Sequence, residues 1–201
     1  GPRGWNGDLS RRAFFHSGTR PPKTRYSMTV QPILIYGDPR LEADNEPVTE
    51  FGAALEEIVE DLFETGWRAP GLGVAAPQIG INLRLATIDV SVGKDPSTKL
   101  VLANPEILST AGKAQVEEGC LSFPGLFTTL QRPQRLRVRA QDRHGEWWET
   151  DADGLLAQAV CHELDHLEGI LLVDHLRGLK RQMFLRRVAK MRRLGVWQET
   201  A

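Results

Sequence analysis

Residues 162–166 read His-Glu-Leu-Asp-His, and this stretch constrains the fold more than any other part of the chain. The apolar residues around it recur at helical offsets: Leu155, Leu156, Ala159, Val160, Leu164, Leu167 and Ile170. Positions i and i+4 of a helix share one face, so His162 and His166 can offer two imidazoles to one cation. Glu163 lies about 100° around the helix, where it can touch a water on that cation. The pattern is typical of metal-assisted hydrolysis, whereas a helix with two surface histidines is the plainer alternative.

A catalytic site of this kind needs three protein ligands and one open position. The chain has two cysteines, Cys120 and Cys161. Cys120 follows Gly119 at a predicted strand-to-turn junction, so its thiolate is a candidate third ligand, with a buried free cysteine as the alternative. Cys161 is adjacent to His162 and points about 100° away from it, which favours core packing. A Cys120–Cys161 disulfide is a further alternative, but two cysteines in 201 residues are too sparse for a disulfide scaffold.

The segment from Gly71 to Gly80 is rich in small residues and lets the backbone approach another group closely. It lacks the third glycine and the following helix start of a dinucleotide-binding turn, and no Gly-Lys-Ser/Thr follows as in a phosphate-binding loop. The uncharged amide of Gln78 can instead donate a hydrogen bond to a developing oxyanion. An ordinary turn is the alternative.

Together, these three segments resemble the motifs of the peptide deformylase family. Residues 71–78 look like its first motif, residues 118–122 are similar to its second, and residues 162–166 to its third, in the same order. The likeness covers roughly residues 28–180. Cys161 departs from the family pattern, which usually has glutamine there, and a polar Gln158 is expected to change the lining of the substrate pocket.

The resemblance implies a hydrolase of linear amides that removes the formyl group from the N-terminal formylmethionine of nascent polypeptides and releases formate. The implied ligands of one divalent metal are Cys120, His162 and His166. This donor set suits Fe²⁺, Zn²⁺, Co²⁺ and Ni²⁺, and the family implies Fe²⁺ in cells. Glu163 is implied as the general base. The Gln78 amide and the backbone N–H of Leu121 are implied as oxyanion donors.

Residues in or beside the motifs are expected to form the substrate site: Leu72, Gly73, Val74, Glu118, Gly119, Phe123, Leu126, Gln158 and Ala159. The apolar members suit the unbranched thioether of formylmethionine. Glu118 is expected to orient a ligand loop, with a surface carboxylate as the alternative.

Apolar periodicity predicts an amphipathic helix over residues 48–67, the histidine helix, and a last basic helix. Strands are expected at residues 83–90, 100–102, 116–121, 136–140 and 147–150. These elements make an α+β domain. The resemblance implies the deformylase-like fold, with small mixed or antiparallel sheets around a central metal-binding helix and further helices toward each terminus.

Three segments are expected along the chain. Residues 28–180 form the catalytic domain, residues 181–201 a basic C-terminal helix and tail, and residues 1–27 a basic extension that is disordered or left from an expression vector. An organelle transit remnant is the alternative for the extension; otherwise the cytoplasm is expected. The net charge of −1 names no partner, no specific DNA contact is expected, and no apolar run reaches the roughly 18 residues of a membrane span.

Eight basic residues and no acid lie between Arg177 and Arg193. The plainer interpretation is a solvated helix face packed on the domain by interleaved apolar residues. Because nascent chains are met at the ribosome, and some deformylases dock there through a C-terminal helix, the ribosome is a candidate partner beside N-formylmethionyl peptides.

Two other functions share parts of this pattern. A zinc peptidase would use the same two histidines and glutamate, but it would take a third ligand downstream, where His175 and Glu168 lack any matching context. A binding protein with a degenerate site would be expected to lack one of the candidate ligands or Glu163. Here all three candidate ligands and Glu163 are present.

Overall fold

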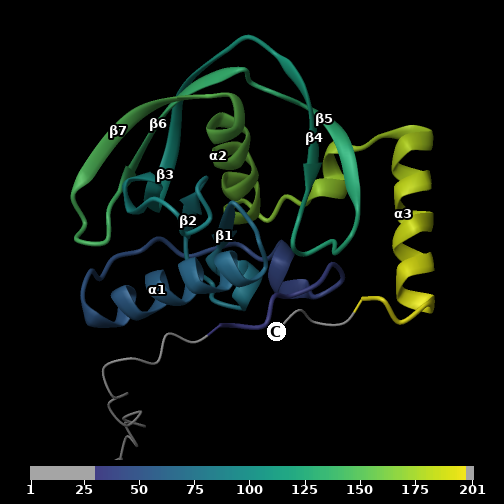
Figure 1. Ribbon diagram of the computed structural model, residues 1–201, viewed down its shortest axis with the longest axis horizontal. Coiled ribbons are helices and arrows are strands. Elements are labelled where there is room, and N and C mark those ends of the chain that lie inside the picture. Colours follow the sequence, from purple (N-terminus) through teal and green to yellow (C-terminus); the bar gives the residue numbers. More distant parts are fainter. Residues whose placement is uncertain (1–29, 198–201) are drawn as a thin grey trace, which may run out of the picture.

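Helix α2, Gly154–Leu167, is the centre of the fold. The computed structural model describes residues 30–197. In it, α2 lies between a five-stranded sheet on one side and a two-stranded hairpin on the other (Figure 1). The helix ends before Gly169, whose φ of 68° lies in the left-handed region that favours glycine. The predicted histidine helix is therefore confirmed, and it carries residues 162–166 in its last turns.

The larger sheet is antiparallel throughout, with the strand order β1-β2-β3-β6-β7. Its strands are β1 Gly73–Ala75, β2 Leu85–Asp89, β3 Lys99–Ala111, β6 Arg135–Gln141 and β7 Trp147–Asp153. Strand β1 lies at one edge, and within the described part of the chain it pairs with β2 alone, so its other edge faces the region beside α2.

Two helices cover opposite faces of this sheet. Helix α1, Ala53–Arg68, buries Leu55, Val59, Leu62 and Phe63, which form one stripe at helical spacing. Side chains alternate along a strand, so Leu85 packs in the cluster with α1, whereas Ala86 packs with α2. The result is three layers: α1, the sheet and α2.

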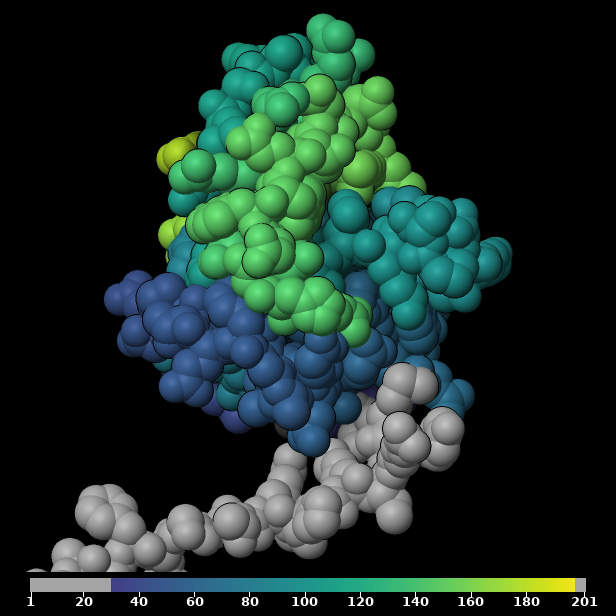
Figure 2. All heavy atoms as spheres, turned by 90° about the vertical axis from the view of Figure 1, so that its left-hand side faces the viewer, coloured from purple at the N-terminus to yellow at the C-terminus, as the bar shows by residue number. Residues whose placement is uncertain are grey.

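The turn between β6 and β7 rests on α1. Arg143 donates to Glu56 at 2.8 Å and to Glu60 at 2.7 Å. Figure 2 shows the green surface of the β6–β7 region directly above the blue surface of α1. The contact ties the far end of the sheet to the helix that lies below it.

The hairpin of β4, Ala114–Gly119, and β5, Phe127–Arg132, forms a second, smaller sheet. Helix α3, Gly178–Arg193, buries Phe184 and Val188 against a separate apolar cluster that includes Phe123, Leu126 and Leu130. Within residues 30–197, no helix combines the length and apolar character that a membrane crossing requires.

The structure confirms the predicted α+β architecture but differs from several of the expected element bounds; α1, for example, begins at Ala53 instead of residue 48. Strand β5 was not predicted, because its side chains are mostly polar and only two of them are buried. Strand β3 runs well beyond the three residues that looked β-rich, and its outer half is exposed. The small-residue loop contains β1 and the 3₁₀ turn η2, Ala76–Ile79. The expected extension over residues 1–27 lies outside the described residues.

Arg132 ties the hairpin to α2. Its side chain is 6% exposed and forms ion pairs with Glu118 of β4 at 2.6 Å and with Asp165 of α2 at 2.8 Å. Burial lowers the pKa of a guanidinium, but the two carboxylates outweigh burial and raise the pKa of Arg132 above its usual range. Asp165 in turn contacts His175 at 2.6 Å, which extends the network to the segment before α3.

Arg132→Met is expected to lower the free energy of unfolding by about 3–5 kcal/mol, because it leaves two carboxylates without their buried partner. Urea denaturation followed by circular dichroism measures the change. Arg137→Met is the matched control, since Arg137 pairs with Glu149 and Asp151 on the surface with its side chain 45% exposed. Surface pairs contribute about 0–1 kcal/mol, so equal losses in the two variants would contradict the proposed role of Arg132.

Candidate metal centre and pocket

The three candidate ligands come from two elements that meet at the hairpin end. Cys120 directly follows β4, and His162 and His166 share one face of α2. Cys120 Sγ lies 3.3 Å from His166 Nε2, and the two histidine Nε2 atoms are 3.2 Å apart. All three donor atoms lie within 4.8 Å of one another, which suits a single cation. The structure therefore brings together the three residues that the sequence singled out.

Glu118 fixes the orientation of His162. Its carboxylate accepts a hydrogen bond from His162 Nδ1 at 2.7 Å and a second, from Arg132, at 2.6 Å. Burial alone would raise the pKa of the Glu118 carboxyl, but hydrogen bonds from His162 and Arg132 outweigh it and lower this pKa to about 2. A charged acceptor on Nδ1 leaves Nε2 of His162 available as a ligand. Glu118 is thus buried, which removes the surface-carboxylate alternative.

The two cysteines have opposite environments, and both are free. Burial raises the pKa of the Cys120 thiol, but the imidazoles of His166 and His162 outweigh burial and bring it down to about 5. Cys161 packs in the core between α2 and the sheet, where burial raises its pKa to about 11. A disulfide between them is therefore excluded, and only Cys120 has the thiolate character that metal binding requires.

Glu163 is 2% exposed, and its Oε2 has no hydrogen-bond partner among the described residues. Burial raises the pKa of this carboxyl to about 7, although the neighbouring histidines oppose the shift. The carboxylate is packed against Gly73: a methyl group there would lie 2.6 Å from Glu163 Oε1 and 2.8 Å from the Thr87 carbonyl oxygen. Glycine in the first motif therefore makes room for the glutamate of the third.

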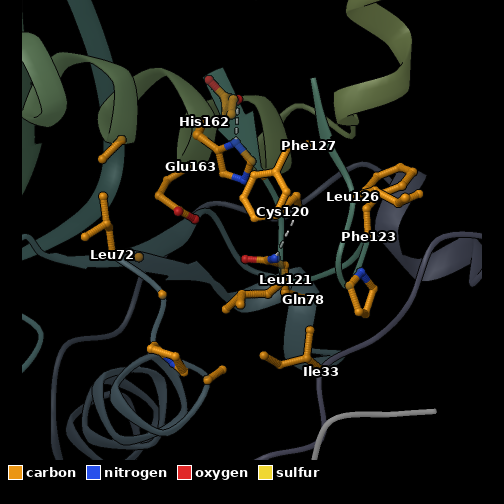
Figure 3. A pocket seen from close by; sticks show the side chains of 18 of the residues that line it. Ile33, Leu72, Gln78, Cys120, Leu121, Phe123, Leu126, Phe127, His162 and Glu163 are labelled. Carbon is orange, nitrogen blue, oxygen red and sulfur yellow. Dashed lines mark hydrogen bonds and ion pairs between the residues drawn. The ribbon is translucent and has the colours of Figure 1, made fainter. Parts of the chain in front are cut away.

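Gln78 comes from η2 and is 1% exposed. Its Oε1 accepts from the backbone N–H of Ala75 at 2.9 Å, and this bond turns Nε2 toward the site. There Nε2 donates to Ser122 Oγ at 3.2 Å and lies 3.8 Å from Cys120 Sγ, as the close-up view in Figure 3 shows for Gln78 and Cys120. The amide is thus held in one orientation beside the candidate ligands.

A pocket of about 740 Å³ opens beside these groups. Of the residues predicted to form the substrate site, the following line it: Leu72, Gly73, Glu118, Gly119, Phe123, Leu126, Gln158 and Ala159. Val74 does not. It is fully buried with α1, because alternation along β1 turns it to the face opposite Gly73. Val74 is therefore corrected from a pocket residue to a core residue.

Other pocket residues could not be read from the motifs. Ile33, Phe127 and Leu155 line the pocket from three separate parts of the chain, and Figure 3 shows Ile33 opposite His162. Phe127 is 55% exposed and Leu155 is 52% exposed, so the pocket has an apolar rim. In the sequence, the signal that could have identified Phe127 and Leu155 as pocket residues is that each lies near a motif.

Phe123 is held in the pocket wall by an aromatic cluster. Its ring stacks on Tyr36 at a centroid distance of 4.8 Å and lies 5.5 Å from Phe184 of α3. Trp197 meets it edge-on at 6.1 Å and donates its indole N–H to the Pro124 carbonyl at 3.0 Å. The C-terminal helix therefore supports one wall of the pocket.

The pocket also lies between two free strand edges. Among residues 30–197, strand β1 pairs only with β2, and β4 pairs only with β5. Gly71 to Gly73 line the pocket from the first edge, and Glu117 to Gly119 line it from the second. An extended peptide could add to such edges through backbone hydrogen bonds. The pocket ends at the candidate ligand group, a buried carboxyl and a fixed amide. This arrangement is suited to hydrolysis of an amide.

Comparison with known proteins agrees with this chemistry. Residues 30–182 match the model of the family described as polypeptide deformylase. The chain is 47% identical to a peptide deformylase of Acidobacterium capsulatum over 85% of this chain and 100% of that protein. It is 43% identical to one of Alkalilimnicola ehrlichii, over 84% of this chain and 94% of that protein.

Solved structures give the same result. A peptide deformylase from Legionella pneumophila matches with a TM-score of 0.79 and 42% identity, over 85% of this chain and 99% of that chain. Peptide deformylase 1B from Arabidopsis thaliana, in complex with an inhibitor, matches with a TM-score of 0.76 and 29% identity, over 85% of this chain and 97% of that one.

Cys120→Ser is expected to weaken metal binding by at least an order of magnitude, because it removes the thiolate of the candidate ligand group. Cys161→Ala is the matched control, since it removes a buried sulfur that is outside that group. Titration of each metal-free protein with Co²⁺, followed by visible absorption, measures the affinity. Equal weakening in both variants would show that Cys120 is not a ligand.

Proposed function

Because the chain belongs to the polypeptide deformylase family, its reaction is the hydrolytic removal of the formyl group from the N-terminal formylmethionine of nascent polypeptides, and we propose that Cys120, His162 and His166 hold the metal for this reaction. The observation that carries the assignment is the convergence of one sulfur and two imidazole nitrogens within 4.8 Å at the end of the pocket. This thiolate and imidazole donor set suits Fe²⁺, Zn²⁺, Ni²⁺ and Co²⁺ alike. Membership of the family favours Fe²⁺ as the metal in cells, with one of the others taking its place after purification.

The donor set fits a divalent metal on the geometry of the chain. Nε2 of both histidines and Sγ of Cys120 face one point, while Nδ1 of His162 is held by the buried Glu118 carboxylate. When bound, the metal supplies Lewis-acid chemistry that acidifies water and polarises a carbonyl.

Glu163 is the proposed general base. It follows His162 on α2 and therefore faces the pocket instead of the ligand point. Its Oε2 has no partner among the described residues, so the atom is available to accept a proton from water and return it to the leaving amine.

Gln78 and the backbone N–H of Leu121 are the proposed donors to the negative oxygen of the tetrahedral intermediate. The Gln78 amide is already oriented by Ala75 and Ser122, so its Nε2 is held beside the candidate ligands where the negative oxygen would form. One such donor contributes about 3–4 kcal/mol to transition-state stabilisation.

The apolar wall explains the fit to formylmethionine. Phe123 and Leu126 are buried residues of the second core cluster that also face the pocket, with Ile33 beside them. An unbranched thioether can pack against such a wall without leaving a polar group unpaired. We place the reaction in the cytoplasm because the substrate is a nascent chain.

Protein reconstituted anaerobically with Fe²⁺ is expected to release formate from formyl-Met-Ala-Ser, and Glu163→Gln to retain the metal and lose most of the turnover. The amide has nearly the same shape as the carboxylate but cannot accept a proton from water. Formate release measures turnover, and elemental analysis measures bound metal. Loss of metal together with activity would make Glu163 a ligand, and no formate from the unaltered protein would refute the proposed function.

Ribosome docking through α3 is the proposed finer partner assignment. Four of the eight basic side chains of this helix region are used within the fold, where they donate to backbone carbonyls: Lys180, Arg181, Arg187 and Arg192. Arg186, Lys190 and Arg193 are exposed and lie at i, i+4 and i+7, on one face of α3. This face is the part that is available to RNA phosphate.

The triple variant R186Q/K190Q/R193Q is expected to lower ribosome co-sedimentation at low salt by roughly an order of magnitude, because three phosphate contacts are lost. The variant R135Q/R137Q/R139Q is the matched control, since it removes equal charge from the exposed side chains of β6. Formate release from a short peptide should be retained by both. Equal co-sedimentation of the two variants would show that α3 has no specific role in docking.

A further inference from the structure

Both edges of the β4–β5 hairpin are capped by side chains from other elements. Glu117 lies opposite Thr129, and Gly119 lies opposite Phe127. Lys180 and Arg187 of α3 donate to the carbonyls of Thr129 and Phe127, so these carbonyls point away from β4. In an antiparallel pair, two opposite residues either both point their N–H and carbonyl groups toward each other or both point them away. Glu117 and Gly119 therefore turn their N–H and carbonyl groups toward the free edge of β4.

On that free edge, Gln158 caps the Glu117 carbonyl. Its Nε2 donates to this oxygen at 3.0 Å. Gln158 lies one helical turn before His162, and both Gln158 and Glu117 line the pocket. At Gly119, beside the candidate ligand Cys120, this edge of β4 is open to the pocket. At Glu117, two residues away, the Gln158 side chain closes it.

We propose that Gln158 is a specificity-determining residue. Its amide occupies the place at the Glu117 carbonyl that the backbone N–H of a substrate's third residue would otherwise take. The inference rests on the proposed function, because it assumes a formylated peptide in this pocket. Residues along a strand are about 3.4 Å apart, so a peptide whose first residue pairs at Gly119 brings its third residue opposite Glu117.

This arrangement makes the third residue nearly silent in binding. A longer peptide that pairs with the Glu117 carbonyl must displace the Gln158 amide, so one hydrogen bond replaces another. A side chain without an N–H donor at position 158 leaves the carbonyl free, and the third residue then adds a hydrogen bond of its own. The polar side chain therefore makes binding insensitive to whether the third residue offers a backbone N–H group.

The test compares two substrates that differ in one N–H group. One is formyl-Met-Ala-Ser, and the other is its depsipeptide, in which an ester oxygen replaces the third backbone N–H. The unaltered protein is expected to give the same KM for both. Gln158→Met keeps the length and unbranched shape of the side chain but lacks the donor, and it is expected to give a KM for the amide that is about 3- to 10-fold lower than for the ester.

Gln115→Met is the matched control, because the same substitution then lies on β4 in an exposed side chain that does not line the pocket. It should leave both KM values unchanged. Gln158→Glu, whose carboxylate cannot donate to a carbonyl, should reproduce the difference if Gln158→Met fails to fold. Equal KM values for amide and ester in the Gln158 variants would overturn the inference. Absence of formate from either substrate with the unaltered protein would instead refute the proposed function.

Discussion

The buried hydrogen-bonded chain from Arg132 through Glu118 to His162 is the interaction on which the site depends. Buried charges are tolerated only when each one is paired, so this chain allows one arrangement of the hairpin relative to α2. The same arrangement places Cys120, at the end of β4, beside the Nε2 atoms of α2. Asp165 binds Arg132 from the other side and strengthens the same alignment. A structural network and the candidate metal centre are therefore one unit.

The sequence predicted the elements whose signal is local and missed those that depend on distant partners. His162, Glu163 and His166 lie within one helical turn, so their relative geometry follows from the helix itself. Arg132 has no local signal: its partners Glu118 and Asp165 are far from it along the chain, and an arginine in a polar segment normally faces solvent. The expected position of Val74 failed for a related reason, because its side of the sheet is set by the pairing of β1 with β2.

Side chains of α2 and α3 cap the two edges of the β4–β5 hairpin and thereby link these helices to it. A two-stranded hairpin is unstable alone and exposes two unpaired edges. Basic residues of α3 close the outer edge of β5, and Gln158 of α2 partly closes the edge of β4. The charge run of α3 therefore has two roles that composition cannot separate. Four of its cations hold the helix on the hairpin and the body, and Arg186, Lys190 and Arg193 remain for a partner.

Two carboxylates beside the same helix show how this packing divides the chemistry. Glu118 accepts hydrogen bonds from His162 and Arg132, and these bonds lower its pKa to about 2, so it remains a charged acceptor. Glu163 is equally buried but has one oxygen without a partner among the described residues, and burial raises its pKa to about 7. Groups whose surroundings push their pKa values apart take different roles. The paired carboxylate orients the candidate ligand His162, and the unpaired one, with Gly73 making room for it, is the candidate group for proton exchange.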